Sequence, residues 1–109
     1  SGTPFREFLA VEDLADGLVF LLKYYNDDAP VNIGTGEEIS IRQLAELIKE
    51  ISGWTGTLEF DTSKPDGSPR KIMNNERIHK LGWRHSTDLK TGLRFAYKWF
   101  AENQSVVRR

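Results

Sequence analysis

The chain has 109 residues, 39% of them hydrophobic, with three Trp, six Phe and three Tyr, and this composition predicts one folded domain with a modest core. Fifteen Lys and Arg balance sixteen Asp and Glu, so bulk charge favours neither nucleic acid nor a membrane surface as a partner. The absence of cysteine excludes disulfides and thiolate metal sites and fits a cytoplasmic protein. No apolar run approaches the roughly 18 residues of a membrane span.

The first half of the chain alternates strand-like and helix-like patterns. Pro4 precedes a short predicted strand at residues 5–10, and apolar residues at helical spacing predict a helix over residues 11–25. A turn rich in Asn and Asp separates this helix from a second predicted strand, a short buried one at residues 31–33.

A second helix begins after Ser40, because Ser40 and Gln43 form a capping-box pattern, and it ends at Gly53. A third strand is predicted at residues 57–61 and is followed by a polar loop over residues 62–71.

The C-terminal third is helical. Asn74 or Asn75 can cap a short helix over residues 76–81, and a last helix begins near Thr87 or Asp88. The order of strands and helices predicts an α/β fold with at least one parallel strand pair, or an α+β arrangement if the chain stands alone. Three short strands make a small sheet, which suggests one piece of a larger α/β protein.

The polar loop TSKPDGSPRK concentrates cations where regular structure is least expected. Pro65-Asp66-Gly67 has turn chemistry, and Pro69 favours an extended backbone for Arg70 and Lys71, whose side chains suit phosphate oxygens. On these residues alone, a solvated surface loop is the favoured interpretation. The same holds for Arg6, for which pairing with Glu7 or Glu12 is the simpler expectation.

Other candidate motifs are better explained structurally. Residues 34–36 (GTG) precede a helix but lack the full glycine pattern of a phosphate loop, and two glutamates follow them, so a tight turn is the preferred interpretation. His79 and His85 lack metal-site spacing and are expected at the surface. Trp54 and Trp83 are expected to cover the edge of the core. No spacing of serine and histidine supports a hydrolytic triad.

The ordered series TPFREFLAVEDLA, VNIGTG, SIRQLAELI, FDTSKPDGSPRK, RIHKLGW and LKTGLRFAYKWFAEN resembles the C-terminal part of the extended short-chain dehydrogenase/reductase family of nucleotide-sugar enzymes. The resemblance covers nearly the whole chain. Within the family it is strongest to the GDP-L-fucose synthase branch, whose members are NADPH-dependent epimerases and reductases of GDP-4-keto-6-deoxymannose. FDTSKPDGSPRK is the discriminating element.

The resemblance implies substrate-binding roles for four residues. Arg6 would contact the diphosphate of the nucleotide sugar. Asp66, Arg70 and Lys71 would border the nucleotide, with Lys71 near phosphate and Asp66 near the ribose or base. With these implied roles, a substrate-binding loop becomes the favoured interpretation in place of a solvated surface loop.

Two positions depart from the family pattern: Ala10 stands where many relatives carry His, and Asn74 where many carry Asp. More importantly, none of the three tyrosines, Tyr24, Tyr25 and Tyr97, is followed four residues later by the lysine of the family's catalytic pair. The glycine-rich cofactor turn is also missing. We therefore expect residues 1–109 to be a C-terminal substrate-binding fragment without its N-terminal cofactor domain, inactive alone and binding no cofactor, whereas the parent uses NADP.

The expected partners are a GDP-sugar and the missing cofactor domain. Self-association is also expected, because the apolar faces of the first helix and of the strand at 31–33 would lack cover. Two alternatives stay open: a fragment of another nucleotide-sugar epimerase or dehydratase, which would bind UDP or dTDP, and a stand-alone binding module without catalysis.

Overall fold

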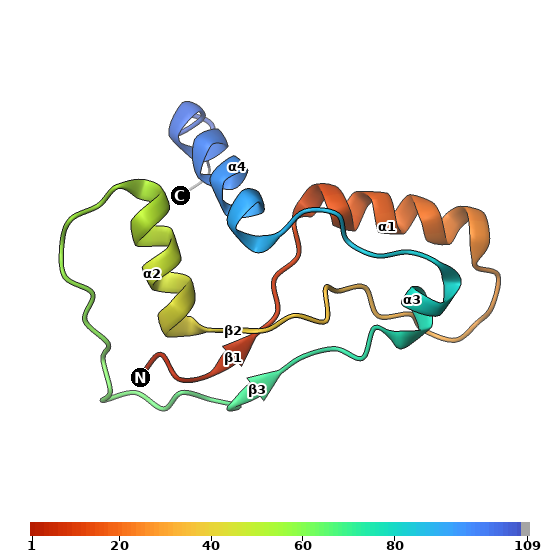
Figure 1. Cartoon of the computed structure of the whole chain (residues 1–109), viewed down its shortest axis with the longest axis horizontal. Coiled ribbons are helices and arrows are strands. Elements are labelled where there is room, and N and C mark those ends of the chain that lie inside the picture. The colour runs from red at the N-terminus through yellow and green to blue at the C-terminus, as the bar shows by residue number, and fades with distance from the viewer. Residues whose placement is uncertain (108–109) are drawn as a thin grey trace.

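The structure is a computed structural model that describes residues 1–107 (Figure 1). Within these residues the chain forms four helices and three two-residue strands: β1 Phe5–Arg6, α1 Val11–Tyr24, β2 Ile39–Ser40, α2 Ile41–Ser52, β3 Arg70–Lys71, α3 Glu76–Leu81 and α4 Leu89–Glu102. The mixed α/β class is confirmed. None of these helices is long and apolar enough to cross a membrane.

The strands form one small sheet in the order β2-β1-β3. β1 is antiparallel to β2 and parallel to β3, so the predicted parallel pair is present. The register pairs Phe5 with Ser40 and with Arg70, and Arg6 with Ile39 and with Lys71. β1 therefore lies in the centre and joins residues that are more than 60 positions apart in the sequence.

Three strand predictions need correction. Residues 31–33 and 57–61 are loop rather than strand, and the predicted strand at 5–10 is reduced to β1. A strand needs a partner backbone, and among the described residues none lies beside these two segments. Their apolar residues pack on other elements instead: Phe60 lies under the Arg42 guanidinium, 4.1 Å from its carbon to the ring centroid.

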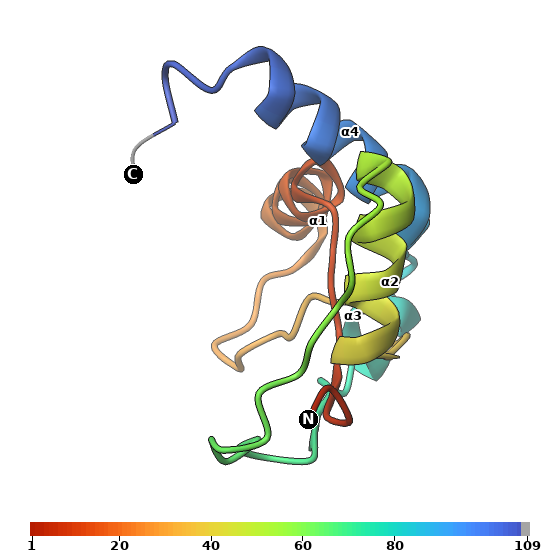
Figure 2. The ribbon, with the colours of Figure 1, turned by 90° about the vertical axis from the view of Figure 1, so that its left-hand side faces the viewer.

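The helices follow their predicted capping signals. Ser40 and Gln43 form both bonds of the capping box at the start of α2, and Gly53 ends that helix with φ 68°. The carboxylate of Asp88 accepts from the Thr91 backbone N–H at 2.7 Å at the start of α4. α2 and α4 pack against each other at one end of the molecule (Figures 1 and 2).

The N-terminus of the short helix α3 is capped by Asn74 and not by Asn75, the residue directly before the helix. The Asn74 side chain accepts from the Glu76 N–H at 2.9 Å, and Asn75 makes no capping bond. Asn75 is instead buried, with 4% of its surface exposed.

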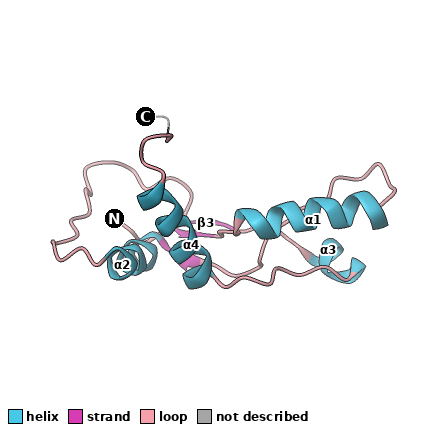
Figure 3. Cartoon of the chain, turned by 90° about the horizontal axis from the view of Figure 1, so that it is seen from above, coloured by secondary structure: helices cyan, strands magenta, loops and turns pink. Residues whose placement is uncertain are grey.

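The most buried apolar side chains belong to α3 and the segment that follows it. Figure 3 shows α3 beside α1, at the opposite end from α2. Ile78 is fully buried and Trp83 is 4% exposed, so Trp83 belongs to the core and not to its edge as predicted. The Trp83 indole lies against Gly17, where a Cβ would come within 3.0 Å of the ring, and its N–H donates to Asp16 at 2.8 Å. Trp54, by contrast, is 52% exposed.

The chain is more open than an independent domain of its size. Its accessible surface is 8274 Å² and its radius of gyration 16.5 Å. A compact protein of this mass would expose about 6,200 Å², with a radius near 13 Å. α1 exposes several large apolar side chains, with Leu18 51% and Leu22 85% exposed. The predicted lack of cover on the first helix is therefore confirmed.

Candidate functional site

A groove of about 560 Å³ runs along the end of the β1–β3 pair. Arg6, Glu7 and residues 70–73 line it. Because paired residues on neighbouring strands share a face, the Arg6–Lys71 register puts these two cations on one face of the sheet. No described carboxylate forms an ion pair with either cation, so the simple pairing of Arg6 with Glu7 or Glu12 is not formed.

Arg70 belongs to the other face of the sheet. It pairs with Phe5 in the register, and its Nε donates to Glu38 at 2.6 Å in an ion pair. The Arg70 side chain is 63% exposed, and exposed ion pairs of this kind contribute only about 0–1 kcal/mol. A competing anion can therefore displace Glu38 at little cost.

Asp66 lies outside the groove. Its carboxylate accepts hydrogen bonds from the amino group and the hydroxyl of Ser1. Gly67 has φ 75°, as the turn chemistry of this loop predicted. The fold thus places Arg6 and Lys71 on one face at the groove, leaves Arg70 at the groove's border in its ion pair with Glu38, and keeps Asp66 apart.

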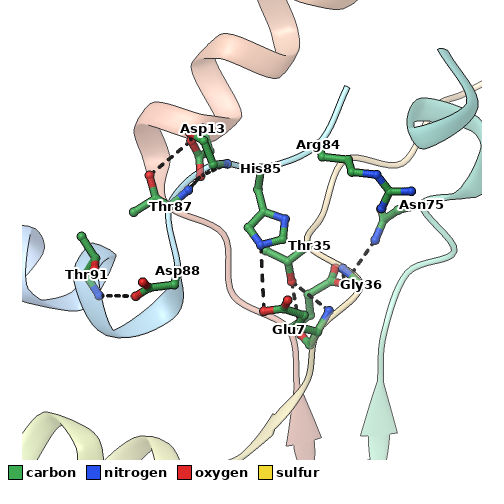
Figure 4. Close-up of polar contacts among 12 residues, drawn as sticks. Glu7, Asp13, Thr35, Gly36, Asn75, Arg84, His85, Thr87, Asp88 and Thr91 are labelled. Carbon is green, nitrogen blue, oxygen red and sulfur yellow. Dashed lines mark hydrogen bonds and ion pairs between the residues drawn. The ribbon is translucent and has the colours of Figure 1, made fainter. Parts of the chain in front are cut away.

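Two residues that sequence reasoning missed tie the groove to the rest of the fold (Figure 4). Glu7 Oε2 accepts from the Gly36 N–H at 2.7 Å and from Asn75 Nδ2 at 3.2 Å. Asn75 Nδ2 also donates to the Met73 carbonyl at 3.3 Å. In the sequence, the Glu7–Asn75 contact is indicated only by the acidic character of Glu7 beside Arg6. The residues around Asn75 do not indicate that its side chain contacts the segment after β1.

The turn at residues 34–36 does not fit a cofactor pyrophosphate. A Cβ on Gly34 would collide with the Glu7 carboxylate, and the Gly36 N–H already donates to that carboxylate. Glu7 thus occupies the position that an anion would take at this turn. The glycines serve close packing and a positive φ, 77° at Gly36, as expected of a tight turn.

The two histidines are half-buried rather than freely exposed, which corrects the surface placement predicted for them. Burial, then the nearby Arg84 and His85, lower the pKa of His79. The His85 ring is 18% exposed, and its Nε2 lies 3.9 Å from Glu37. The described residues contain no cluster of three or more side chains suited to holding a metal ion.

Solved structures that resemble the chain define its class. The chain superimposes with TM-score 0.86 on UDP-glucose 4-epimerase from Thermotoga maritima, at 24% identity over 95% of this chain and 34% of that one. It superimposes with TM-score 0.95 on a GDP-L-fucose synthetase from Naegleria fowleri bound to NADP, at 33% identity over all of this chain and 35% of that one. The fold is that of part of an extended short-chain dehydrogenase/reductase.

Sequence relatives are more specific. The chain is 50% identical to probable GDP-L-fucose synthase 1 from rice over 103 residues, which cover 94% of this chain and 31% of the relative. It is 42% identical to GDP-L-fucose synthase from Escherichia coli K12 over 99% of this chain and 36% of that relative. No known family profile matches the chain. The chain is therefore homologous to about a third of a GDP-L-fucose synthase, which confirms the resemblance found in its sequence.

Proposed function

We propose that this chain forms the nucleotide-binding wall for a GDP-sugar in an NADP-dependent epimerase/reductase of the GDP-L-fucose synthase type. The observation that carries the proposal is the pairing of Arg6 with Lys71 across the β1–β3 register, on one face and without acidic partners among the described residues. A planar guanidinium fork beside an ammonium point charge suits the oxygens of a diphosphate. The substrates named by the chain's relatives support the same ligand.

Each predicted residue takes a role within this proposal. Arg6 binds the diphosphate and Lys71 a phosphate oxygen. Arg70 exchanges Glu38 for the nucleotide, because that exposed ion pair is weak. Asp66, once released from Ser1, accepts hydroxyl groups of the ribose or donors of the base.

The chemistry would lie outside this chain. The resemblance assigns the acid/base tyrosine, its lysine and the NADP site to the part of the protein that the chain does not span. This chain would provide binding energy that orients the sugar, and alone it would neither turn over substrate nor bind NADP. The turn at residues 34–36 supports that division, because the Glu7 carboxylate accepts the Gly36 N–H and lies against Gly34, where a cofactor phosphate would have to bind. A cytoplasmic location stays a prediction.

We assign the missing cofactor domain as the cover for the chain's apolar surface. A groove of about 590 Å³ lies between α1 and α4 and is lined mainly by apolar residues, among them Phe8, Val11, Leu93 and Trp99. Relatives about three times as long support a large intramolecular partner.

Calorimetric titration with GDP tests the function. Arg6→Ala and Lys71→Ala should each lower GDP affinity about tenfold or more, because each removes a charged hydrogen-bond donor. Lys64→Ala is the matched control, since Lys64 lies in the same loop but does not line the groove. Equal affinities for all three variants would overturn the assignment of the groove.

The fold of a UDP-glucose 4-epimerase favours UDP as a second candidate nucleotide. Comparison of GDP with UDP in the same titration decides between them. Tighter binding of UDP would replace the GDP-sugar proposal by one for a UDP-sugar enzyme.

A further inference from the structure

The sheet that presents the two groove cations is very short. The β1–β3 ladder holds only two residue pairs, and Arg6–Lys71 is the second of them. Beyond that pair the backbone ladder no longer fixes the distance between the groove walls, which continue as Glu7 on one side and residues 72–73 on the other. Strands of two residues are shorter than the usual range of about 3–10 residues, so few backbone hydrogen bonds hold this pair together.

One buried side chain bridges the walls at that point. Asn75 Nδ2 donates to both walls, to Glu7 Oε2 at 3.2 Å and to the Met73 carbonyl at 3.3 Å. Glu7 Oε2 is itself anchored by the Gly36 N–H at 2.7 Å. Asn75 therefore continues the connection between β1 and β3 by one step beyond the ladder.

The bridge is not explained by stability alone. Asn75 is 4% exposed, and Asn75 Oδ1 and Glu7 Oε1 are buried without a hydrogen-bond partner among the described residues. Unpaired buried acceptors are costly, and an apolar side chain at position 75 would remove the cost of Asn75 Oδ1, although not that of Glu7 Oε1. An amide at position 75 is expected if ligand binding in the groove depends on a fixed spacing between its two walls.

We propose that Asn75, acting through Glu7, is a positioning residue that holds the two groove walls together directly beyond the Arg6–Lys71 pair, so that both cations face a nucleoside diphosphate at once. This inference rests on the proposed function of the groove. A fixed spacing favours a ligand that contacts both cations at once and is of little use to a ligand with one phosphate. The bridge should therefore control the preference for GDP over GMP more than it controls affinity for phosphate in general.

The test compares GDP and GMP affinities of the full chain and its variants by calorimetry. Asn75→Asp places a carboxylate against Glu7 and removes both donors, so the GDP/GMP affinity ratio should fall about three- to tenfold. Asn74→Asp is the matched control: it adds the same charge one residue away and keeps the oxygen that caps Glu76. Its ratio should stay at the wild-type value.

A charge-neutral rescue separates positioning from a general loss of structure. In the double variant Glu7→Gln, Asn75→Asp, the new glutamine can donate to the new aspartate while its oxygen still accepts from Gly36. This restores the contact between residues 7 and 75 through which Asn75 is proposed to act, while the Met73 carbonyl stays without its donor. Recovery of at least part of the GDP/GMP ratio in the double variant would support the bridge. Equal loss of GDP and GMP affinity in Asn75→Asp, or no recovery in the double variant, would overturn it.

Failure of the inference is distinguishable from failure of the proposed function. If Arg6→Ala and Lys71→Ala weaken GDP binding but Asn75→Asp leaves the ratio unchanged, only the positioning role is wrong. If neither cation variant affects GDP binding, the groove itself is wrong and the positioning role falls with it.

Discussion

Asp13 joins α1 to the segment that leads into α4, and its removal is the sharpest test of the fold. Asp13 is 5% exposed. Its carboxylate accepts from the backbone N–H of Ser86 at 3.2 Å and of Thr87 at 2.9 Å, and from the Ser86 and Thr87 hydroxyls at 3.0 and 3.4 Å (Figure 4). Hydrogen bonds to a charged group contribute about 1.5–3 kcal/mol each. Asp13→Ala removes the acceptor and leaves two backbone donors unpaired.

We expect Asp13→Ala to lower the free energy of unfolding by about 3–5 kcal/mol. Urea denaturation followed by the fluorescence of the buried Trp83 measures this loss. Glu12→Ala is the control, because Glu12 lies exposed beside Asp13 in the first turn and should change stability by less than about 0.5 kcal/mol. A loss for Asp13→Ala no larger than that of the control would refute the reasoning.

The same carboxylate gives a pH dependence of known sign. Burial by itself would raise the pKa of Asp13, but the hydrogen bonds from Thr87 and Ser86 outweigh burial and hold it below the ordinary value of 3.8. Because the folded pKa lies below the unfolded one, this stabilisation is complete above the unfolded pKa and is lost as the pH falls through the folded pKa. Below about pH 4 the wild-type chain should therefore approach Asp13→Ala in stability.

Two further predictions concern packing. Gly34→Ala would drive a Cβ into the Glu7 carboxylate, so it should destabilise the chain by about 1–3 kcal/mol and weaken GDP binding. Gly53→Ala is the control: its Cβ would meet open space, so only stability should change. Unchanged GDP affinity in folded Gly34→Ala would contradict the link between Glu7 and the groove. The uncovered face of α1 and the edge strands β2 and β3 should make the isolated chain self-associate, and a monomer at high concentration in light scattering would disprove this.

Local signals were sufficient to predict the helices. The 3.6-residue periodicity gave α1, and the capping box at Ser40 and the cap at Asp88 gave the starts of α2 and α4, because each signal is complete within a few residues of the sequence. The strands were not predictable in this way. A two-residue strand has no periodicity to detect, and the pairing of Phe5 with Arg70 depends on the folded chain.

The two wrong strands were apolar for another reason. Ile33 packs against Gly17 of α1, where its Cγ2 would lie 3.4 Å from a Cβ, and Phe60 packs under Arg42. Apolar side chains that contact helices look the same in a sequence as those of a strand.

The candidate site was only half visible in the sequence. Turn chemistry and the family resemblance singled out Arg6, Arg70 and Lys71, but the register decides that Arg6 and Lys71 share a face while Arg70 joins Glu38. The Asn75 bridge to β1 spans 68 positions and has no local signature, so only the fold reveals it.

Nuclear magnetic resonance titration of the chain with GDP tests the central claim most directly. If the groove binds the diphosphate, chemical-shift changes should concentrate at Arg6 and at residues 66–71, even if binding is weak without the rest of the protein. Changes confined to other surfaces, or none at millimolar GDP while the spectrum shows a folded chain, would contradict the account.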